Sequence, residues 1–281
     1  MEVQDNSFFK VPLPELKEKA YKVRRHLVDL IYSAGSGHLD TSLSLVEIWL
    51  GLTYSKFFHL DAHDGAWDGR DRIFLSEGHA CPVQYVINAE LGYYPYEELV
   101  SGFRHPKTPF QGHTDRSLAH GFENSNGSLS IGMWQAYGHA LELDQQVFCI
   151  AGDGEFQEPA SIGLLAAPHN LKPLGNFTLI VNNNRLAQDS MVDIGAIVDV
   201  ATAYGWQTLS VNGHDLSALG EAYVQAVENT TQPTFLLCNT VKGYGGDPLR
   251  ADKLGSHGVP PKDEKELREY KNGVENWWRN A

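Results

Sequence analysis

Short apolar runs alternate along this chain with longer amphipathic stretches. The runs have the length of buried strands, and the apolar residues between them recur at helical spacing. Strand, helix, strand at such intervals is typical of an α/β fold, a mostly parallel sheet with helices on both faces. The expected strands cover residues 72–76, 147–151, 177–181, 208–211 and 234–240, and the expected helices cover a stretch ending near Gly92 and residues 159–170, 195–204 and 215–229.

Two helices are expected before the first strand. Apolar residues share one helical face from Pro14 to Gly35, and proline and glycine are typical at a helix start and end. Ser44 followed three residues later by Glu47 has the form of a capping box, so a second helix is expected from Ser44 through Phe58.

Composition narrows the class of protein. The 281 residues are 42% hydrophobic, which suffices for one large domain with a substantial core. The net charge of −13 argues against nucleic acid and anionic membranes as partners. The chain shows no signal peptide and no apolar run near the roughly 18 residues of a membrane span. Its scattered cysteines, Cys81, Cys149 and Cys238, suit buried thiols in a cytoplasmic protein.

Two polar segments follow neighbouring strand-like runs. Gly152-Asp153-Gly154 comes directly after residues 147–151, and Asn182-Asn183-Asn184 ends the run 177–181. Adjacent parallel strands would bring both to one carboxyl edge, where open α/β sheets bind ligands. Glycines beside Asp153 let backbone amides approach a phosphate, and the following helix would point its positive end at it. Such triplets also occur in ordinary turns, but a carboxylate with amide and phosphate oxygens suits Mg²⁺. The pair of segments indicates a metal and a diphosphate.

Histidine recurs in loops beside small residues, at His38, His79, His113 and His257. Each alone is more often a solvated loop side chain. Loops carry a large share of functional residues, however, and histidine is the usual acid or base near neutral pH. The recurrence around a diphosphate motif therefore favours proton transfer, and no spacing of histidine and cysteine suggests zinc.

These motifs together resemble the transketolase family of thiamine diphosphate enzymes, specifically the amino-terminal cofactor-binding half. They occur in the family's order and cover about residues 15 to 261, so their joint specificity is high. The resemblance implies the thiamine diphosphate-binding fold. The matching segments are Ala34–His38, Asp71–His79, Gln111–His113, Gly127–Leu129, Gly152–Glu158, Thr240–Gly245 and Ser256–Gly258.

The resemblance also implies a cofactor site, with thiamine diphosphate and Mg²⁺ (or Ca²⁺) as cofactors. The metal ligands would be Asp153, Asn184 and the Leu186 carbonyl, although Asn182 or Asn183 could replace Asn184 because the asparagine run blurs the register. The implied cofactor contacts are Gly127, Ser128, Leu129, Gly152, Asp153, Gly154, Glu155, Asn184, His79 and His257.

The implied catalytic residues are His38, His79, His113, His257 and Glu158. The histidines would surround the thiazolium ring and the sugar, and would move protons as the carbon–carbon bond breaks. Glu158 would belong to the acidic relay that links the two active sites of such dimers. A buried structural glutamate is the competing interpretation of Glu158.

The family transfers a two-carbon ketol unit from a ketose to an aldose, and its cofactor-activating glutamate lies in a second domain. We expect residues 1–261 to form the thiamine diphosphate-binding domain and 262–281 a charged helical tail, too short for another domain. The chain should therefore work with a separate carboxyl-terminal subunit, as a heterodimer or a two-plus-two heterotetramer, and alone should show no ketol transfer. Trp277 and Trp278 would pack the tail or mark a subunit contact.

Some positions depart from the family pattern, namely Leu39-Asp40, Ser130-Ile131 and Pro159. A carboxylate at Asp40 would repel a phosphate, which suggests a non-phosphorylated or specialised sugar. Two alternatives stay open. One is the α subunit of a 2-oxo acid dehydrogenase, although the histidine loops fit sugars better. The other is a non-catalytic scaffold subunit that retains the fold.

Overall fold

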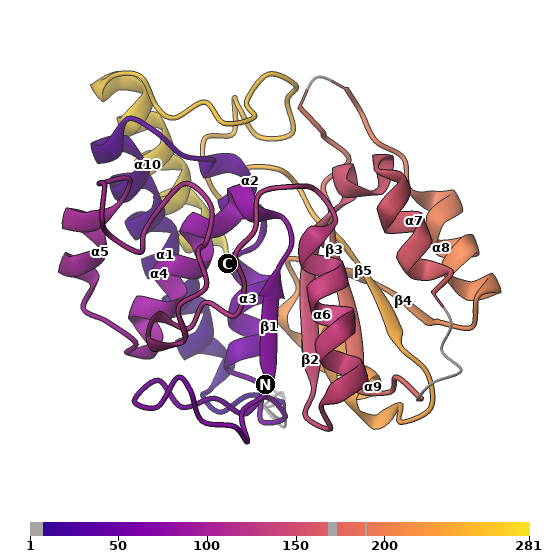
Figure 1. The fold of residues 1–281 in the computed structure, drawn as a ribbon. Helices are drawn as coiled ribbons and strands as arrows, with labels where there is room; N and C mark the ends of the chain where they lie inside the picture. Colours follow the sequence, from indigo (N-terminus) through magenta and orange to yellow (C-terminus); the bar gives the residue numbers. More distant parts are fainter. Residues whose placement is uncertain (1–7, 168–172, 189) are drawn as a thin grey trace, which may run out of the picture.

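The sheet has five parallel strands in the order β1-β2-β3-β5-β4. This computed structural model describes residues 8–167, 173–188 and 190–281. Because the strands are all parallel, their carboxyl ends meet at one edge, the upper one in Figure 1. The predicted parallel α/β fold is confirmed. The strands are β1 (Arg72–Leu75), β2 (Val147–Gly152), β3 (Phe177–Asn183), β4 (Gln207–Asn212) and β5 (Thr234–Asn239).

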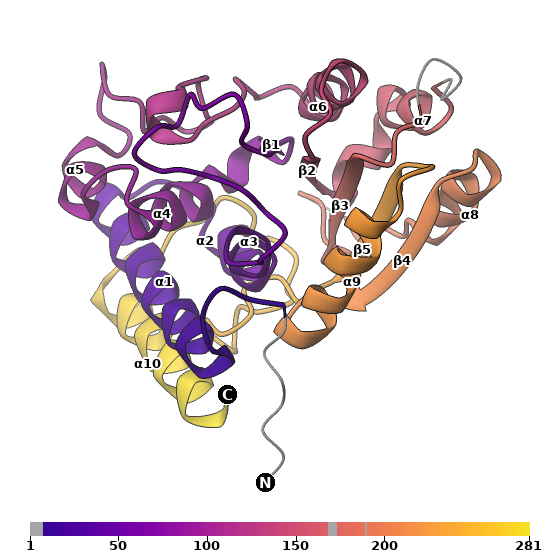
Figure 2. The same cartoon turned by 90° about the horizontal axis from the view of Figure 1, so that it is seen from below.

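Helices cover both faces of the sheet (Figures 1 and 2). One face carries α6 (Ile131–Glu142), α7 (Pro159–Leu165) and α8 (Gly195–Ala203). Among the described residues, none of the helices is long and apolar enough to cross a membrane. The other face carries α1 (Leu13–Ala34), α2 (Leu39–Ser44), α3 (Val46–Thr53), α4 (Cys81–Leu91), α5 (Tyr96–Gly102), α9 (Leu216–Glu228) and α10 (Glu264–Asn280).

Two hydrophobic cores result, one on each side of the sheet. Side chains alternate along a strand, so neighbouring residues belong to opposite cores. Phe74 and Cys149 pack under α6, α7 and α8, whereas Leu75 and Ile150 pack under the larger group of helices. The central strands β2, β3 and β5 are therefore mostly apolar, as the uninterrupted runs in the sequence predict, whereas the edge strand β4 is partly polar and only partly buried.

The last helix of the chain, α10, lies along the first helix, α1 (Figure 2). The guanidinium of Arg24 lies 4.1 Å from the ring centroid of Trp277, and Trp278 stacks on Tyr21 with centroids 5.2 Å apart. Tyr270 of α10 is fully buried. A helix, Glu264–Asn280, thus packs on the body where the tail is expected, and the division into a domain ending at residue 261 and a tail stays a prediction.

The predicted capping box at Ser44 was wrong. Ser44 ends α2, and its hydroxyl donates to the Thr41 carbonyl at 2.7 Å. Glu47 instead forms an ion pair with the buried Arg24 at 2.7 Å. Since a buried arginine needs a carboxylate partner, this tertiary contact outweighs the local cap. The expected helix corresponds to α3, which begins at Val46 and ends at Thr53, before Phe58.

Two other element boundaries differ from the sequence prediction. β3 continues through Asn182 and Asn183, so Asn184 is the first residue beyond the strand. The helix expected over 159–170 ends at Leu165, and part of that range lies outside the described residues. The longer β3 places Asn184 at the carboxyl edge of the sheet.

Candidate active site

A cavity of about 230 Å³ opens at the carboxyl edge of the sheet, beyond β2 and β3. It brings together the residues that the sequence predicted for a cofactor and a metal. Leu129 from the loop before α6 and Glu77 from the loop after β1 also line it. The predicted residues in its wall are His79, Leu129, Gly152, Asp153, Gly154, Glu155, Asn184, Leu186 and His257.

Asp153 is buried and lines this cavity. Its Oδ2 accepts a hydrogen bond from the backbone N–H of Arg185 at 2.5 Å. Burial, and then the nearby Glu77 carboxylate, raise the pKa of Asp153 to about 6. A carboxylate held out of water beside a second acid is one that a divalent cation would stabilise. A side chain at Gly154 would meet only Ala187, at 3.7 Å, so Gly154 leaves open space beside Asp153.

The side chains of Asn182, Asn183 and Asn184 have different hydrogen-bond partners. The amide of Asn182 donates to Glu77 Oε2 at 3.1 Å, and the amide of Asn183 donates to Asn239 at 2.8 Å. Asn184 lines the cavity with Asp153, and its Oδ1 accepts from the Leu186 N–H at 3.0 Å. Of the three candidates that the register left open, Asn184 is the one beside Asp153.

Glu155 directs its carboxylate into the protein. Its Oε1 accepts from the Ser76 hydroxyl at 2.7 Å and from the Ser130 N–H at 2.8 Å, and its Oε2 accepts from the Gly152 N–H at 2.9 Å. Burial outweighs these hydrogen bonds and raises the pKa of Glu155 to about 7. Although Glu155 lines the cavity, these contacts make it a residue that ties the loop before α6 to the end of β2.

The helix expected directly after the glycine motif is a 3₁₀ helix of five residues, Asp153–Gln157. The α-helix α7 begins only at Pro159. The amides nearest the cavity therefore belong to one short 3₁₀ helix, and the dipole of a long helix does not point at the site.

Three of the predicted histidines form a compact cluster. The ring centroids of His38, His79 and His257 are 4.8 Å apart in every pair. Burial, then the neighbouring His79, lower the pKa of His38 to about 3 and that of His257 to about 4. The buried Nδ1 of His38 has no hydrogen-bond partner among the described residues. The rings of His38 and His257 are therefore neutral at pH 7, and each can donate and accept a proton.

His113 lies against the same cluster. A side-chain carbon at Gly78 would come within 2.8 Å of the His113 ring, so the glycine before His79 admits His113. Burial, then His79, lower the pKa of His113. A carbon at Gly258 would likewise lie 2.9 Å from His38 Nε2. The small residues beside these histidines let the rings approach one another.

Gly127, Ser128 and Glu158 are predicted residues that do not line the cavity. Gly127 has a φ of 149°, which few other residues adopt. Ser128 and Leu129 follow it and are exposed. Glu158 is also exposed in this chain, which does not support the interpretation of Glu158 as a buried structural residue.

Two departures from the family pattern have local explanations. Ser130 stands where the family has glycine and adopts a φ of 66°, a left-handed conformation that aligns its N–H with Glu155. Pro159 is the first residue of α7, where a missing N–H costs no helical hydrogen bond. Neither residue blocks the cavity.

Asp40 does not face the cavity. Its side chain is buried, and its Oδ1 accepts from the Tyr270 hydroxyl of α10 at 2.7 Å. Burial raises the pKa of this carboxyl. The idea that Asp40 repels a phosphorylated sugar loses its structural basis, because this group joins α2 to α10.

Lys242 is a site residue that sequence reasoning missed. Its buried Nζ donates to the Leu186 carbonyl at 3.4 Å and lies 3.3 Å from His257 Nδ1. Burial lowers its pKa, while the charges of Glu77, Asp40 and Asp153 oppose that shift. Lys242 lies within the segment Thr240–Gly245, but a loop lysine ordinarily suggests a solvated charge. Its acidic neighbours come from distant parts of the sequence.

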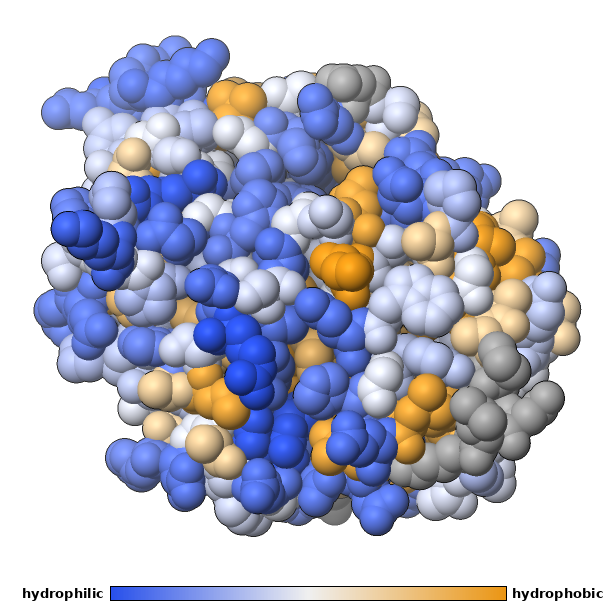
Figure 3. All heavy atoms as spheres, viewed as in Figure 1, coloured by the Kyte–Doolittle hydropathy of each residue, from blue (hydrophilic) through white to orange (hydrophobic). Residues whose placement is uncertain are grey.

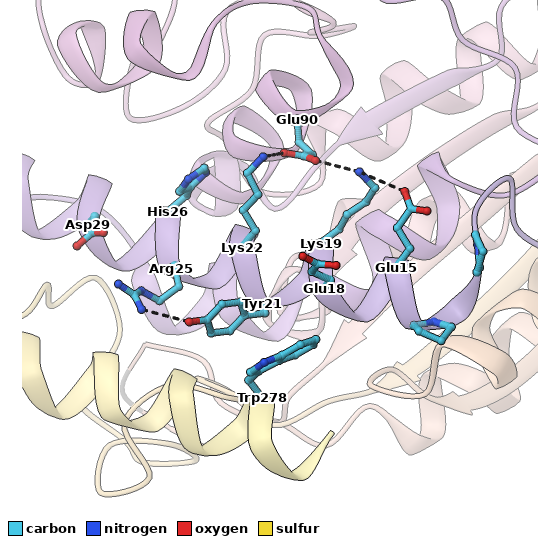
Figure 4. A pocket seen from close by; sticks show the side chains of 12 residues that line it. Glu15, Glu18, Lys19, Tyr21, Lys22, Arg25, His26, Asp29, Glu90 and Trp278 are labelled. Carbon is cyan, nitrogen blue, oxygen red and sulfur yellow. Dashed lines mark hydrogen bonds and ion pairs between the residues drawn. The ribbon is translucent and has the colours of Figure 1, made fainter.

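A larger groove lies elsewhere, along the outer side of α1 (Figure 4). It measures about 1170 Å³ and is lined mainly by charged side chains. Glu90 pairs with Lys19 at 3.0 Å and with Lys22 at 2.6 Å. Arg25 contacts Tyr21 and Glu275. Its cations already have partners within the chain.

Known proteins resemble this chain over most of its length. The family described as "Transketolase, thiamine diphosphate binding domain" matches residues 16–276. The 6-deoxy-6-sulfo-D-fructose transketolase subunit SqwG of Clostridium sp. (strain MSTE9) is 31% identical, over 89% of this chain and 93% of that protein. Mouse transketolase is 33% identical, over 90% of this chain and 41% of its own length.

A solved structure shows the same relationship. The transketolase of Campylobacter jejuni subsp. jejuni NCTC 11168 superposes with a TM-score of 0.82 at 27% identity, covering 94% of this chain and 43% of that one. The chain thus spans about two fifths of these longer transketolases. These relatives do not favour the alternative of a 2-oxo acid dehydrogenase subunit. The chain belongs to the transketolase family, as a thiamine diphosphate-binding domain.

Proposed function

We propose that this chain is the amino-terminal, cofactor-binding subunit of a two-subunit transketolase. The complex would transfer a two-carbon ketol unit from a ketose to an aldose. The observation that carries the proposal is the cavity in which Asp153 and Asn184 lie beside His79 and His257. Thiamine diphosphate, when bound, supplies the electron sink that carbon–carbon cleavage requires.

The metal in this proposal is Mg²⁺ or Ca²⁺, held by Asp153, Asn184 and the Leu186 carbonyl. All three residues line the cavity. The described residues contain no group of three or more His, Cys, Asp or Glu side chains that could hold a metal. Oxygen ligands from a diphosphate would complete the coordination, as is usual for Mg²⁺. Lys242 adds a positive charge beside these groups.

The proton-transfer groups would be His38, His79, His113 and His257. Neutral imidazoles at pH 7 can hydrogen-bond the hydroxyl and carbonyl groups of a ketose and exchange protons with them. The lowered pKa values of His38, His113 and His257 keep these three rings uncharged at pH 7. Glu158, exposed near the cavity, would reach a group on another subunit.

A separate carboxyl-terminal subunit is the proposed partner, in a two-plus-two assembly. The relative SqwG is named a subunit, and the match covers 93% of it. Apolar side chains are exposed on loops beside the site and near the start of α6 (Figure 3). Exposed apolar surface of this kind marks interaction sites. These exposed residues include Leu129 at 44%, Met191 at 71% and Leu249 at 65%.

Reconstitution tests the proposal. The purified chain, a candidate carboxyl-terminal subunit and their mixture are each assayed for ketol transfer with thiamine diphosphate and Mg²⁺. We expect turnover only in the mixture, and measurable turnover by the chain alone would refute the split. Calorimetry with cofactor, metal and partner tests the scaffold alternative, which predicts no binding. Oxidation of pyruvate with an added electron acceptor would instead revive the dehydrogenase alternative.

A further inference from the structure

We propose that His214 is a positioning residue for the cofactor site and acts through the backbone of residues 240–245, here called the Lys242 segment. The proposal rests on the proposed transketolase function and adds to it a residue that lies outside the cavity. His214 belongs to the turn between β4 and α9, and it does not line the cavity beyond β2 and β3. Its side chain is only 6% exposed, so the surrounding structure holds the ring in place.

The ring of His214 contacts a group on each of its two nitrogens. The Val241 N–H donates to Nε2 at 2.8 Å. Since a backbone N–H can only donate, Nε2 is the unprotonated nitrogen, and Nδ1 carries the proton. Nδ1 lies 3.3 Å from Glu47 Oε2, and the buried Glu47 also pairs with Arg24 at 2.7 Å. His214 therefore connects the Lys242 segment to a buried ion pair.

Packing joins the same turn to the Lys242 segment. The ring of Tyr244 stacks on His214, with centroids 3.6 Å apart and planes inclined by 15°. A side-chain carbon at Gly213 would lie 2.5 Å from Thr240 Cγ2, so only glycine lets the turn approach this closely. The turn thus contacts the segment on both sides of Lys242.

The segment places the ammonium of Lys242 at the cofactor site. Its Nζ donates to the Leu186 carbonyl, a proposed metal ligand, at 3.4 Å and lies 3.3 Å from His257 Nδ1. A lysine ammonium is a point charge on a flexible stem, so its position depends on where the backbone holds the stem. A displaced backbone at Val241 would move this charge away from the site. We infer that the hydrogen bond to His214 keeps it there.

Hydrogen exchange of the full, unliganded chain gives the first test. His214→Phe keeps a ring but removes the acceptor, whereas His214→Gln keeps an acceptor and a donor. We expect the Val241 amide to exchange about fivefold faster or more in His214→Phe, the effect of one lost hydrogen bond, and at a near-native rate in His214→Gln. The matched control is His26→Phe, since His26 stacks on Tyr96 in the same manner, with centroids 3.8 Å apart and planes inclined by 15°.

The amides of β5 serve as the internal reference for folding. Native exchange in β5 with faster exchange at Val241 in His214→Phe supports the proposal, and native exchange at both contradicts it. If His214→Phe destabilises the whole chain, His214→Gln decides. Native exchange at Val241 in that variant supports the role of the acceptor, and faster exchange there beside a native β5 overturns it.

A double-mutant cycle tests whether His214 acts through Lys242. Calorimetry measures the affinity of the chain with its partner subunit for thiamine diphosphate and Mg²⁺. We expect His214→Phe and Lys242→Met each to weaken binding about 10-fold or more, because a hydrogen bond to a charged group contributes at least that much. The double variant should bind as Lys242→Met does, and His26→Phe should bind as the native chain does.

The two tests separate this inference from the proposed function. Losses that multiply in the double variant would show that His214 acts by another route and would overturn the proposal. Absence of cofactor binding by the native complex would refute the proposed function instead. The exchange of Val241 would then still decide whether His214 holds the Lys242 segment.

Discussion

The groove along α1 and the cavity at the carboxyl edge of the sheet differ in how their charges are balanced. In the groove, Glu90 pairs with Lys19 and Lys22, so its groups satisfy one another. In the cavity, Asp153 and Glu77 lie close together and out of water, and burial raises the pKa of Asp153 to about 6. The groove is several times larger, yet the predicted cofactor and metal ligands line the cavity. Buried charge that the chain leaves uncompensated indicates a ligand better than volume does.

Asp153→Asn in the cavity is expected to have the largest effect and so tests the difference between cavity and groove most strongly. We expect it to weaken binding of thiamine diphosphate with Mg²⁺ by at least about 100-fold, since it removes the one carboxylate of the proposed metal site. Calorimetry measures the loss, and Glu90→Gln in the groove is the matched control. Unchanged cofactor affinity in Asp153→Asn would remove Asp153 from the site.

The same variant should not harm the unliganded fold. The folded-state pKa of Asp153 is raised from 3.8 to about 6. Its contribution to stability is therefore fully present below about pH 4 and lost as the pH rises through 6. Above pH 7, the neutral asparagine should leave the unliganded chain at least as stable as the native protein. Urea unfolding measures this, and a large destabilisation at pH 8 would show that Asp153 is structural.

Acidity should affect cofactor binding through the same group. Metal binding needs the ionised carboxylate, so affinity should be constant above about pH 6 and fall up to about 10-fold per pH unit below it. Titrations between pH 5 and 8 measure the profile. Constant affinity across this range would contradict the assignment of Asp153.

Glu155→Gln tests whether the hydrogen bonds of the Glu155 carboxylate stabilise the loops around the cavity. Three donors share this carboxylate, and an amide cannot accept from all of them, so we expect a loss of about 1–3 kcal/mol in the free energy of unfolding. Denaturant unfolding measures it. Stability equal to that of the native chain would show that these hydrogen bonds are dispensable.

The smallest effect is expected in the groove. Glu90→Gln should lower the free energy of unfolding by no more than about 1 kcal/mol, because Lys22 is exposed and such pairs contribute little. Cofactor affinity should not change. A loss of cofactor binding in Glu90→Gln would overturn the distinction between the two regions.

Features governed by short stretches of sequence could be predicted. Apolar runs gave the parallel strands, and the glycine and asparagine segments identified the edge at which Asp153 and Asn184 meet. Features governed by distant contacts could not. Glu47 resembles a capping residue until the buried Arg24 is known, and Asp40 resembles a pocket residue until Tyr270 is placed beside it.

The central claim is that Asp153 and Asn184 hold a divalent metal against the diphosphate of the cofactor. The most direct measurement is a crystal structure of the chain grown with thiamine diphosphate and Mn²⁺, with anomalous scattering from the metal. The account predicts a metal peak bonded to the Asp153 carboxylate, the Asn184 amide oxygen and a diphosphate oxygen. A metal bound away from these residues, or a diphosphate outside this cavity, would contradict it.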